Sequence, residues 1–171
     1  MVTNAVAKVS MRTYFSSHHF WAAKHFARLA HDAESAHNGP PRFDVQHRAY
    51  VTDAVFSAVA FLEAAINEVF DDVADAHSGY VDPLSLECRR QMMGLWDESV
   101  ERRSFLEKCQ LALLCAQSTV FERGKQPYQD ADLLIKLRDR LTHARAETRP
   151  LMMSRITPVT RRRRKTGLVR L

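Results

Sequence analysis

The most apolar part of the chain runs from Ala54 to Phe70 and reads AVFSAVAFLEAAINEVF. Its hydrophobic side chains recur every three or four residues, the spacing that places them along one side of a helix. Further apolar residues widen this stripe until little polar surface is left, which is typical of a helix in the middle of a bundle. The pattern therefore predicts a central helix over about 47–76. Glu63 and Asn67 lie four positions apart on it and share a face, where a carboxylate needs a partner.

Four further helical stretches are expected around this central one. The first covers about 11–36 and ends before Asn38-Gly39-Pro40-Pro41, because glycine and two prolines do not continue a helix. The second starts at Asp82-Pro83, since aspartate caps a first turn and proline suits the first helical position. The last two cover about 100–119 and 130–146. The apolar stripe of the last helix consists of Leu133, Leu134, Leu137 and Leu141.

The composition supports the same fold class. Hydrophobic residues make up 46% of the 171 residues, enough for a core, while 5 glycines and 6 prolines are too few for a turn-rich β-sandwich. The chain is therefore predicted to be all-α, a bundle of four or five helices.

The positive charge of the chain is concentrated near its end. The net charge is +5, but residues 149–171 hold eight lysines and arginines and no acidic residue, so residues 1–148 are net acidic by three. We therefore divide the chain into a helical domain, 1–148, and a basic tail, 149–171. Dense like charge with little apolar surface predicts a disordered tail. The abrupt change at Arg149 also raises the hypothesis of a divergent, truncated or frameshifted end.

Several classes of protein are disfavoured by the residues present. Cys88, Cys109 and Cys115 show no CxxC spacing, which argues against a disulfide framework and fits a reducing compartment. No apolar run is judged to approach the ~18–20 residues of a membrane span, and residues 1–10 lack a hydrophobic signal core. The cytoplasm is the expected location, without a membrane partner. Eight histidines occur without HExxH or a carboxylate–histidine cluster at ligand spacing, so no metal and no other cofactor is expected.

The segment Leu137–His143, LRDRLTH, holds the residue types best suited to chemistry. Arg138 and His143 are separated by roughly 140° around a helix, so long side chains at these positions can flank a shared cleft. An arginine can hold and neutralise a phosphate, and a histidine can exchange a proton near neutral pH. Together they could cleave RNA without a metal: the 2′-hydroxyl attacks the phosphorus, His143 moves the proton, and Arg138 stabilises the phosphoryl oxygens.

The same residues also have simpler structural interpretations. Arg138 can pair with Glu63, and His143 can cap the carbonyl groups at the end of its helix. Trp21 and Trp96 are interpreted as core anchors rather than as platforms for nucleic-acid bases, and the cysteines as small core residues.

Three blocks of sequence together resemble the HEPN superfamily, over roughly residues 50–148. They are Phe61–Phe70 with Glu63 and Asn67, Gln126–Asp130, and Leu134–His143 with Arg138 and His143. Members of this superfamily are helical bundles that usually dimerise, with the Arg–His motifs of both protomers beside one cleft. Many are metal-independent endoribonucleases in toxin–antitoxin and other defence systems, whereas others have lost catalysis and bind partners.

The resemblance implies a role for each matching residue. Arg138 and His143 would be catalytic, and Asp139, Glu63 and Asn67 would be supporting residues. Arg140 and Arg145 would contact the RNA substrate. The expected partners are RNA, a second copy of the chain, and an antitoxin or a nucleotidyltransferase-like protein.

Two departures from the family pattern are present. Asp139 stands where asparagine is common, and a carboxylate beside the phosphate site would repel the substrate. After His143 the family commonly continues with an aromatic–Lys–Pro–Glu type sequence, whereas this chain leads into its arginine-rich tail. The alternative function is therefore a catalytically inactive HEPN-like domain that binds a protein or nucleotide partner.

Overall fold

The computed structural model of the chain describes residues 11–39, 43–97 and 100–144, and these contain helices and no strand. The all-α prediction is confirmed. The elements are α1 (Phe15–Ser35), α2 (Val45–Ala74), α3 (Leu86–Asp97), a short 3₁₀ turn η1 (Val100–Arg102), α4 (Phe105–Cys115) and α5 (Tyr128–Thr142). The basic tail 149–171 and Arg145 lie outside the described residues, so the expectations for them remain predictions.

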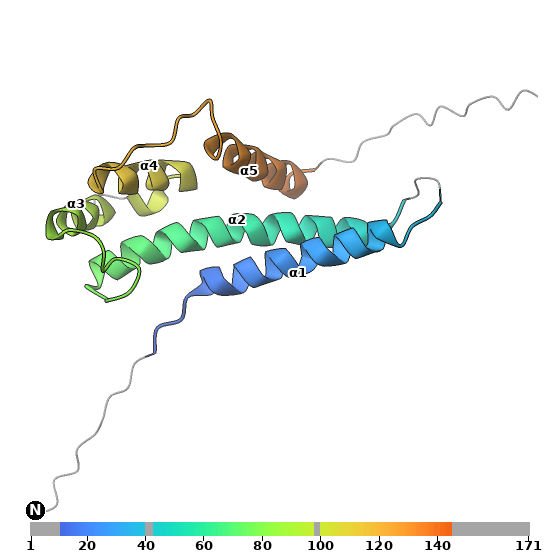
Figure 1. Cartoon of the computed structure of the whole chain (residues 1–171), viewed down its shortest axis with the longest axis horizontal. Coiled ribbons are helices and arrows are strands. Elements are labelled where there is room, and N and C mark those ends of the chain that lie inside the picture. The colour runs from blue at the N-terminus through green and yellow to red at the C-terminus, as the bar shows by residue number, and fades with distance from the viewer. Residues whose placement is uncertain (1–10, 40–42, 98–99, 145–171) are drawn as a thin grey trace, which may run out of the picture.

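Helices α1 and α2 form a long antiparallel hairpin, against which the other helices pack (Figure 1). Asp44 caps the start of α2, because its side chain accepts a hydrogen bond from the backbone N–H of His47 at 3.0 Å. The start of α1 is fixed to α2 because the backbone N–H of Ser16 donates to Glu68 Oε1 at 2.8 Å, and its hydroxyl donates to Oε2.

A second polar contact holds the segment before α1. Asp72 is fully buried and accepts hydrogen bonds from the hydroxyl of Tyr14, and its Oδ1 lies 2.9 Å from Arg12 Nε. Burial and the hydrogen bond to Asp72 raise the pKa of Tyr14, and the hydrogen bond to Asp75 raises that of Arg12. The register of the hairpin is therefore set by carboxylates on the last third of α2.

The hydrophobic core lies at one end of the molecule, between the last turns of α2, α3, η1 and α4. Phe70 and Met92 are its largest members, and the ring of Trp96 stacks on that of Phe70 with centroids 5.1 Å apart. The core consists of Phe70, Val73, Val81, Cys88, Met92, Val100 and Cys115. Cys88 and Cys115 are buried as expected, and Cys109 is partly buried.

The predicted start of the third helix at Asp82-Pro83 is wrong. Those residues form a turn in which Asp82 Oδ2 accepts from the backbone N–H of Gly79 at 3.1 Å. α3 begins three residues later than Pro83, where the hydroxyl of Ser85 accepts from the backbone N–H of Cys88 at 3.2 Å. A serine therefore caps the helix, while the aspartate closes the preceding turn.

The predicted helix over 100–119 is shorter and interrupted. η1 comes first, and α4 starts at Phe105 behind a capping box, in which the Ser104 hydroxyl and the Glu107 carboxylate bond to each other's backbone N–H. The hydrogen bonds from Ser104 lower the pKa of Glu107. Ser104, which follows η1 and caps α4, therefore divides one apolar run into two elements.

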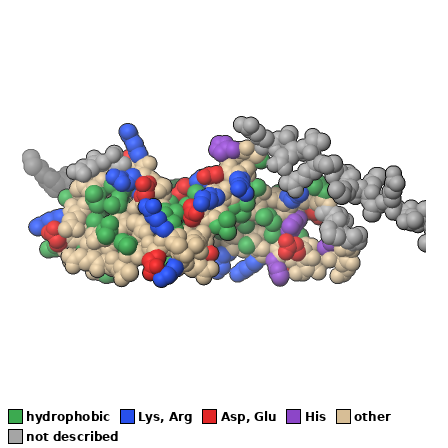
Figure 2. Space-filling model, turned by 90° about the horizontal axis from the view of Figure 1, so that it is seen from above, with side chains coloured by type: hydrophobic (Ala, Val, Ile, Leu, Met, Phe, Trp, Pro, Cys, Tyr) green, Lys and Arg blue, Asp and Glu red, His purple; other side chains and the backbone are tan. Residues whose placement is uncertain are grey.

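α5 lies across the middle of α2 (Figure 1), but most of its leucine stripe is exposed. Leu133 is 67% exposed, and Leu137 and Leu141 are exposed as well, whereas Leu134 is partly covered. Figure 2 shows the face that carries α4 and α5, where hydrophobic side chains form patches between charged ones. A stripe of this kind is typical of a surface that meets a partner.

Two further expectations need correction. Trp21 is not a core anchor: it is 66% exposed on α1, while Trp96 is partly buried.

The sequence was also judged to lack a membrane-length apolar run, yet α2 is long and apolar enough to cross a membrane by length and composition. A helix at the centre of a bundle meets the same criteria, and α2 contacts α1, α3, α4 and α5.

Candidate functional site

The candidate site is centred on Arg138, which projects from α5 onto α2. Its Nη2 donates a hydrogen bond of 3.1 Å to Glu63 Oε1. Its Nε lies 2.9 Å from Asp139 Oδ1, an ion pair by distance, but the buried N–H makes no hydrogen bond with any described residue. The side chain is thus partly buried between two carboxylates. The structural interpretation of Glu63 as the partner of Arg138 is confirmed.

His143 lies at the end of the last helix, which was expected to continue to about 146. α5 ends at Thr142, and His143 is the C-terminal cap, with its backbone N–H donating to the carbonyl of Asp139 at 3.0 Å. Thr142 contributes to this end, because its hydroxyl donates to the carbonyl of Arg138 at 2.9 Å. The imidazole is exposed, so solvent or a substrate can reach it.

The remaining predicted residues of the last helix are also on the surface. Asp139 and Arg140 are both exposed in the last turn of α5. Arg145 was assigned to RNA contact together with Arg140, and lies outside the described residues. Besides Arg138 and His143, the described end of α5 thus carries one cation, Arg140, and one carboxylate, Asp139.

Asn67 does not contact Arg138. Its side-chain oxygen accepts a hydrogen bond of 2.6 Å from Lys108 Nζ of α4. Lys108 is only 5% exposed, and its ammonium group lies 5.4 Å from the centre of the Trp96 ring. Burial lowers the pKa of Lys108, because the charged form loses water that one amide and one ring only partly replace.

Lys108 and Asn67 line a pocket of about 270 Å³ that also reaches Glu63. The other charged residues of this pocket are Glu101, within η1, and Arg103, directly after it. Glu63 therefore stands between two cations: it bonds to Arg138 and contributes to the electrostatic environment of Lys108. The candidate site extends from α5 across α2 to α4.

The role of Lys108 was missed by the sequence reasoning. A signal was present, since Lys108 is the one cation inside the apolar run Phe105–Cys115. A lysine surrounded by leucines and cysteines on a short helix is a candidate for a buried charge. Its partner could not be read from the sequence, because Asn67 is 41 positions away.

The arrangement can bind an anion, but the anion would compete with two carboxylates for Arg138. The fork of Arg138 is suited to a phosphate, and His143 is close to it in the chain and accessible. Glu63 and Asp139 already neutralise much of the guanidinium charge. A phosphate at Arg138 must therefore displace or share one of these carboxylates.

Metal and thiol chemistry receive no support from the described side chains. Residues 11–39, 43–97 and 100–144 contain no group of three or more His, Cys, Asp or Glu side chains arranged to hold a metal ion. Burial raises the pKa of Cys109 to about 11, and it raises those of Cys88 and Cys115 as well. These thiols are protonated at neutral pH and are poor nucleophiles.

Comparison with protein-family models, with curated protein sequences and with solved structures returned no match for this chain. The functional assignment therefore depends on the residues and on their geometry.

Proposed function

We propose that the chain is a HEPN-like, metal-independent endoribonuclease of a cytoplasmic toxin or defence system, acting as a homodimer. The observation that supports this proposal is the 3.1 Å hydrogen bond from Arg138 to Glu63, which holds the guanidinium of α5 in place on the helix that ends at the accessible His143. A fixed arginine and a reachable histidine are the two groups that RNA transesterification needs in the absence of a metal.

The exposed leucine stripe supports the dimer. Leu133, Leu137 and Leu141 repeat every four residues along the outer side of α5, the helix that also carries Arg138. Burial of such a stripe against its own copy would bring two Arg–His pairs to one interface. The dimer would therefore form and complete the site in a single step.

In the proposed reaction, the 2′-hydroxyl of a ribose attacks the adjacent phosphorus and the bond to the 5′-oxygen of the next nucleotide breaks. His143 takes the proton from the 2′-hydroxyl or gives one to the leaving oxygen, and Arg138 stabilises the phosphoryl oxygens. The products are a 2′,3′-cyclic phosphate and a free 5′-hydroxyl. Glu63 acts as a positioning residue, because it orients Arg138 through their hydrogen bond.

The experiment is RNA cleavage in EDTA by the wild type, Arg138→Ala and His143→Ala, with total tRNA and a single-stranded RNA as substrates. We expect cyclic-phosphate ends, and a loss of at least about 100-fold in each variant, the usual scale for general acid–base groups. Lys136→Ala is the matched control, since it removes one exposed cation of α5 outside the site and should retain the wild-type rate. Cleavage that persists unchanged in Arg138→Ala would contradict the proposal.

A second function is favoured by the two carboxylates at Arg138. With Glu63 at 3.1 Å and Asp139 at 2.9 Å, the guanidinium is largely neutralised, as expected of a catalytically inactive domain that binds a partner. Asp139→Asn distinguishes the two functions because it removes one of these charges. An endoribonuclease should cleave faster in this variant, whereas a folded, dimeric protein inactive in both forms supports the binding domain.

A further inference from the structure

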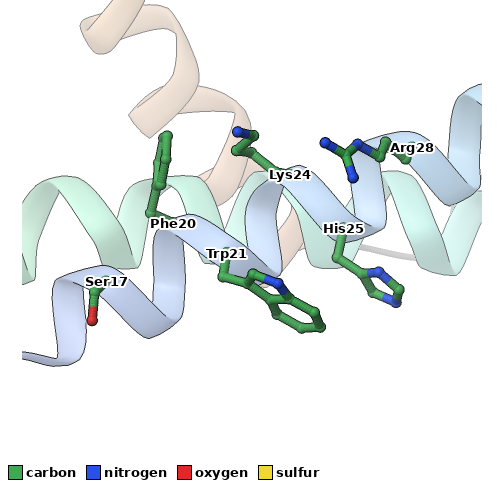
Figure 3. A pocket seen from close by; sticks show the side chains of 6 residues that line it. All are labelled: Ser17, Phe20, Trp21, Lys24, His25 and Arg28. Carbon is green, nitrogen blue, oxygen red and sulfur yellow. The ribbon is translucent and has the colours of Figure 1, made fainter.

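The outer side of α1 carries an exposed aromatic and basic groove. It has a volume of about 380 Å³ and is formed entirely by side chains of one helix (Figure 3). We call it the α1 groove, and its lining residues are Ser17, Phe20, Trp21, Lys24, His25 and Arg28. Trp21 is its most exposed large side chain, at 66%, which is unusual for a tryptophan of a folded domain.

The residues of the α1 groove form two rows. Phe20, Lys24 and Arg28 repeat every four positions in the first row, and the ammonium group of Lys24 lies 5.2 Å from the centre of the Phe20 ring. Trp21 and His25 form the second row, with their rings stacked 4.9 Å apart and only 9° from parallel (Figure 3). The groove thus offers flat aromatic faces beside two permanent cations.

The charge of this surface is opposite to that of the domain as a whole. α1 has no acidic residue from Phe15 to His31, and no carboxylate lines the groove. The cations of this segment are Lys24 and Arg28, with four histidines along the same helix, although residues 1–148 are net acidic. A cationic strip on an acidic domain selects a polyanion over a neutral apolar partner.

We propose that the α1 groove binds single-stranded RNA, with one base stacked on the Trp21 face and the neighbouring phosphates on Lys24 and Arg28. Exposed aromatic rings interleaved with cations are the pattern by which proteins hold unpaired nucleotides, because every base has a flat face and every linkage a negative charge. This inference rests on the proposed function for the identity of the strand as RNA.

The α1 groove and the candidate site both contact the same stretch of α2. The ring of Phe20 packs on that of Phe61 of α2 with centroids 5.1 Å apart, and Glu63, the partner of Arg138, follows two residues later. The groove and the candidate site therefore lie at the same level of α2, on two helices that both pack against it (Figure 1).

The test measures binding separately from cleavage. The probe is a fluorescein-labelled, single-stranded 2′-O-methyl RNA of twelve nucleotides, which lacks the free 2′-hydroxyl and cannot be cleaved by transesterification. The protein is the full chain with Trp96→Phe, so that Trp21 is the sole tryptophan. We expect the probe to quench the Trp21 fluorescence. We also expect Trp21→Ala to weaken binding about 5- to 150-fold, the change that follows from about 1–3 kcal/mol of stacking per base.

Three companion variants make the result specific. Trp21→Phe retains an aromatic face and should restore most of the affinity, which shows that stacking rather than folding is affected. Lys24→Ala and Arg28→Ala should each weaken binding and reduce the slope of log affinity against log salt by about 0.7. Lys136→Ala, which removes an exposed cation of α5 outside the groove, should leave the affinity unchanged.

The outcomes separate this inference from the nuclease proposal. Binding that depends on Trp21, without any cleavage, would support RNA binding by the α1 groove and contradict the nuclease proposal. Cleavage together with unchanged binding in Trp21→Ala would contradict RNA binding by the α1 groove and support the nuclease proposal. A third outcome is that Trp21→Ala changes the oligomeric mass in light scattering while its affinity for the probe stays the same. The groove is then a contact between two copies of the chain, and the inference is overturned.

Discussion

The two ends of the molecule are built differently. Where α2 ends, α3, η1 and α4 surround Phe70 and Met92, and apolar side chains meet one another inside the fold. Farther from this end, the described residues of α1 and α5 flank α2, and large apolar side chains such as Trp21 and Leu133 remain at the surface. The first end follows the usual rule for a hydrophobic core, and the second does not.

This difference separates stability from recognition. The packed end buries enough apolar surface to hold α3 and α4, whose own lengths of 12 and 11 residues are marginal for isolated helices. The open end carries the α1 groove, the leucine stripe and Arg138. Mutations at the two ends should therefore have opposite signatures: loss of folding at one, and loss of binding or assembly with folding retained at the other.

The largest effect is expected for Phe70→Ala, at the centre of the packed end. Its ring is fully buried and stacked on Trp96, so the variant should lose about 3–5 kcal/mol of unfolding free energy, measured by urea denaturation. Leu133→Ala is the matched variant at the open end and should change the free energy by less than about 0.5 kcal/mol. Similar losses in both variants would show that the two ends do not differ.

A smaller effect, of opposite sign, is expected for Lys108→Met. Burial lowers the pKa of Lys108, so its charged form destabilises the fold at every pH below that lowered value. This penalty declines as the pH rises toward the ordinary lysine value of 10.5. Methionine has no charge to desolvate, and the variant should be about 1 kcal/mol more stable than the wild type at pH 7.

The pH dependence of Lys108→Met is its most specific feature. The advantage of the variant should shrink between pH 7 and pH 10, when both proteins are unfolded by urea in parallel at each pH. A difference that stays constant with pH would contradict the assigned cause. Packing against Trp96 would then account for the whole effect.

The smallest effect on folding is expected for Leu137→Glu, which tests the proposed dimer at the open end. Its side chain is exposed, so the unfolding free energy should change by no more than about 0.5 kcal/mol. Light scattering at micromolar concentration should change from a dimer to a monomer. Thr119→Glu adds the same charge at an exposed position away from α5 and should remain dimeric. A monomeric wild type would refute the dimer.

Much of the fold could be predicted from periodicity. The central helix was expected over 47–76 and is found at Val45–Ala74, because its apolar pattern is long and hardly interrupted. The prediction of where α3 starts was wrong because Asp82-Pro83 and Ser85 are both acceptable caps. Only the tertiary turn around Gly79 selects the serine. Local patterns give the existence of a helix more reliably than its ends.

The candidate site was predicted less completely. The pair between Arg138 and Glu63 was among the alternatives, because a carboxylate on an apolar helix needs a cation. The burial of Lys108 and the exposure of Trp21 depend on which helices cover α1 and α4, and no pattern within a single helix contains that information. The proposed roles of Arg138 and His143 remain predictions that the cleavage experiment tests.

The hairpin of α1 and α2 has a consequence for motion. α2 contains 30 residues and is about 45 Å long, yet its carboxylate contacts to the start of α1 and its buried phenylalanine are all near one end. The hairpin end near Val45 is held by an exposed contact, His47 Nε2 to Glu34 Oε1 at 2.8 Å, whereas the other end is held by buried groups, so amplitudes should grow from Phe70 toward Val45. Hydrogen exchange of the backbone amides should follow the same gradient, with the fastest opening at the tip of the hairpin. Arg138 contacts α2 at Glu63, at an intermediate position, where α5 would follow its bending only partly.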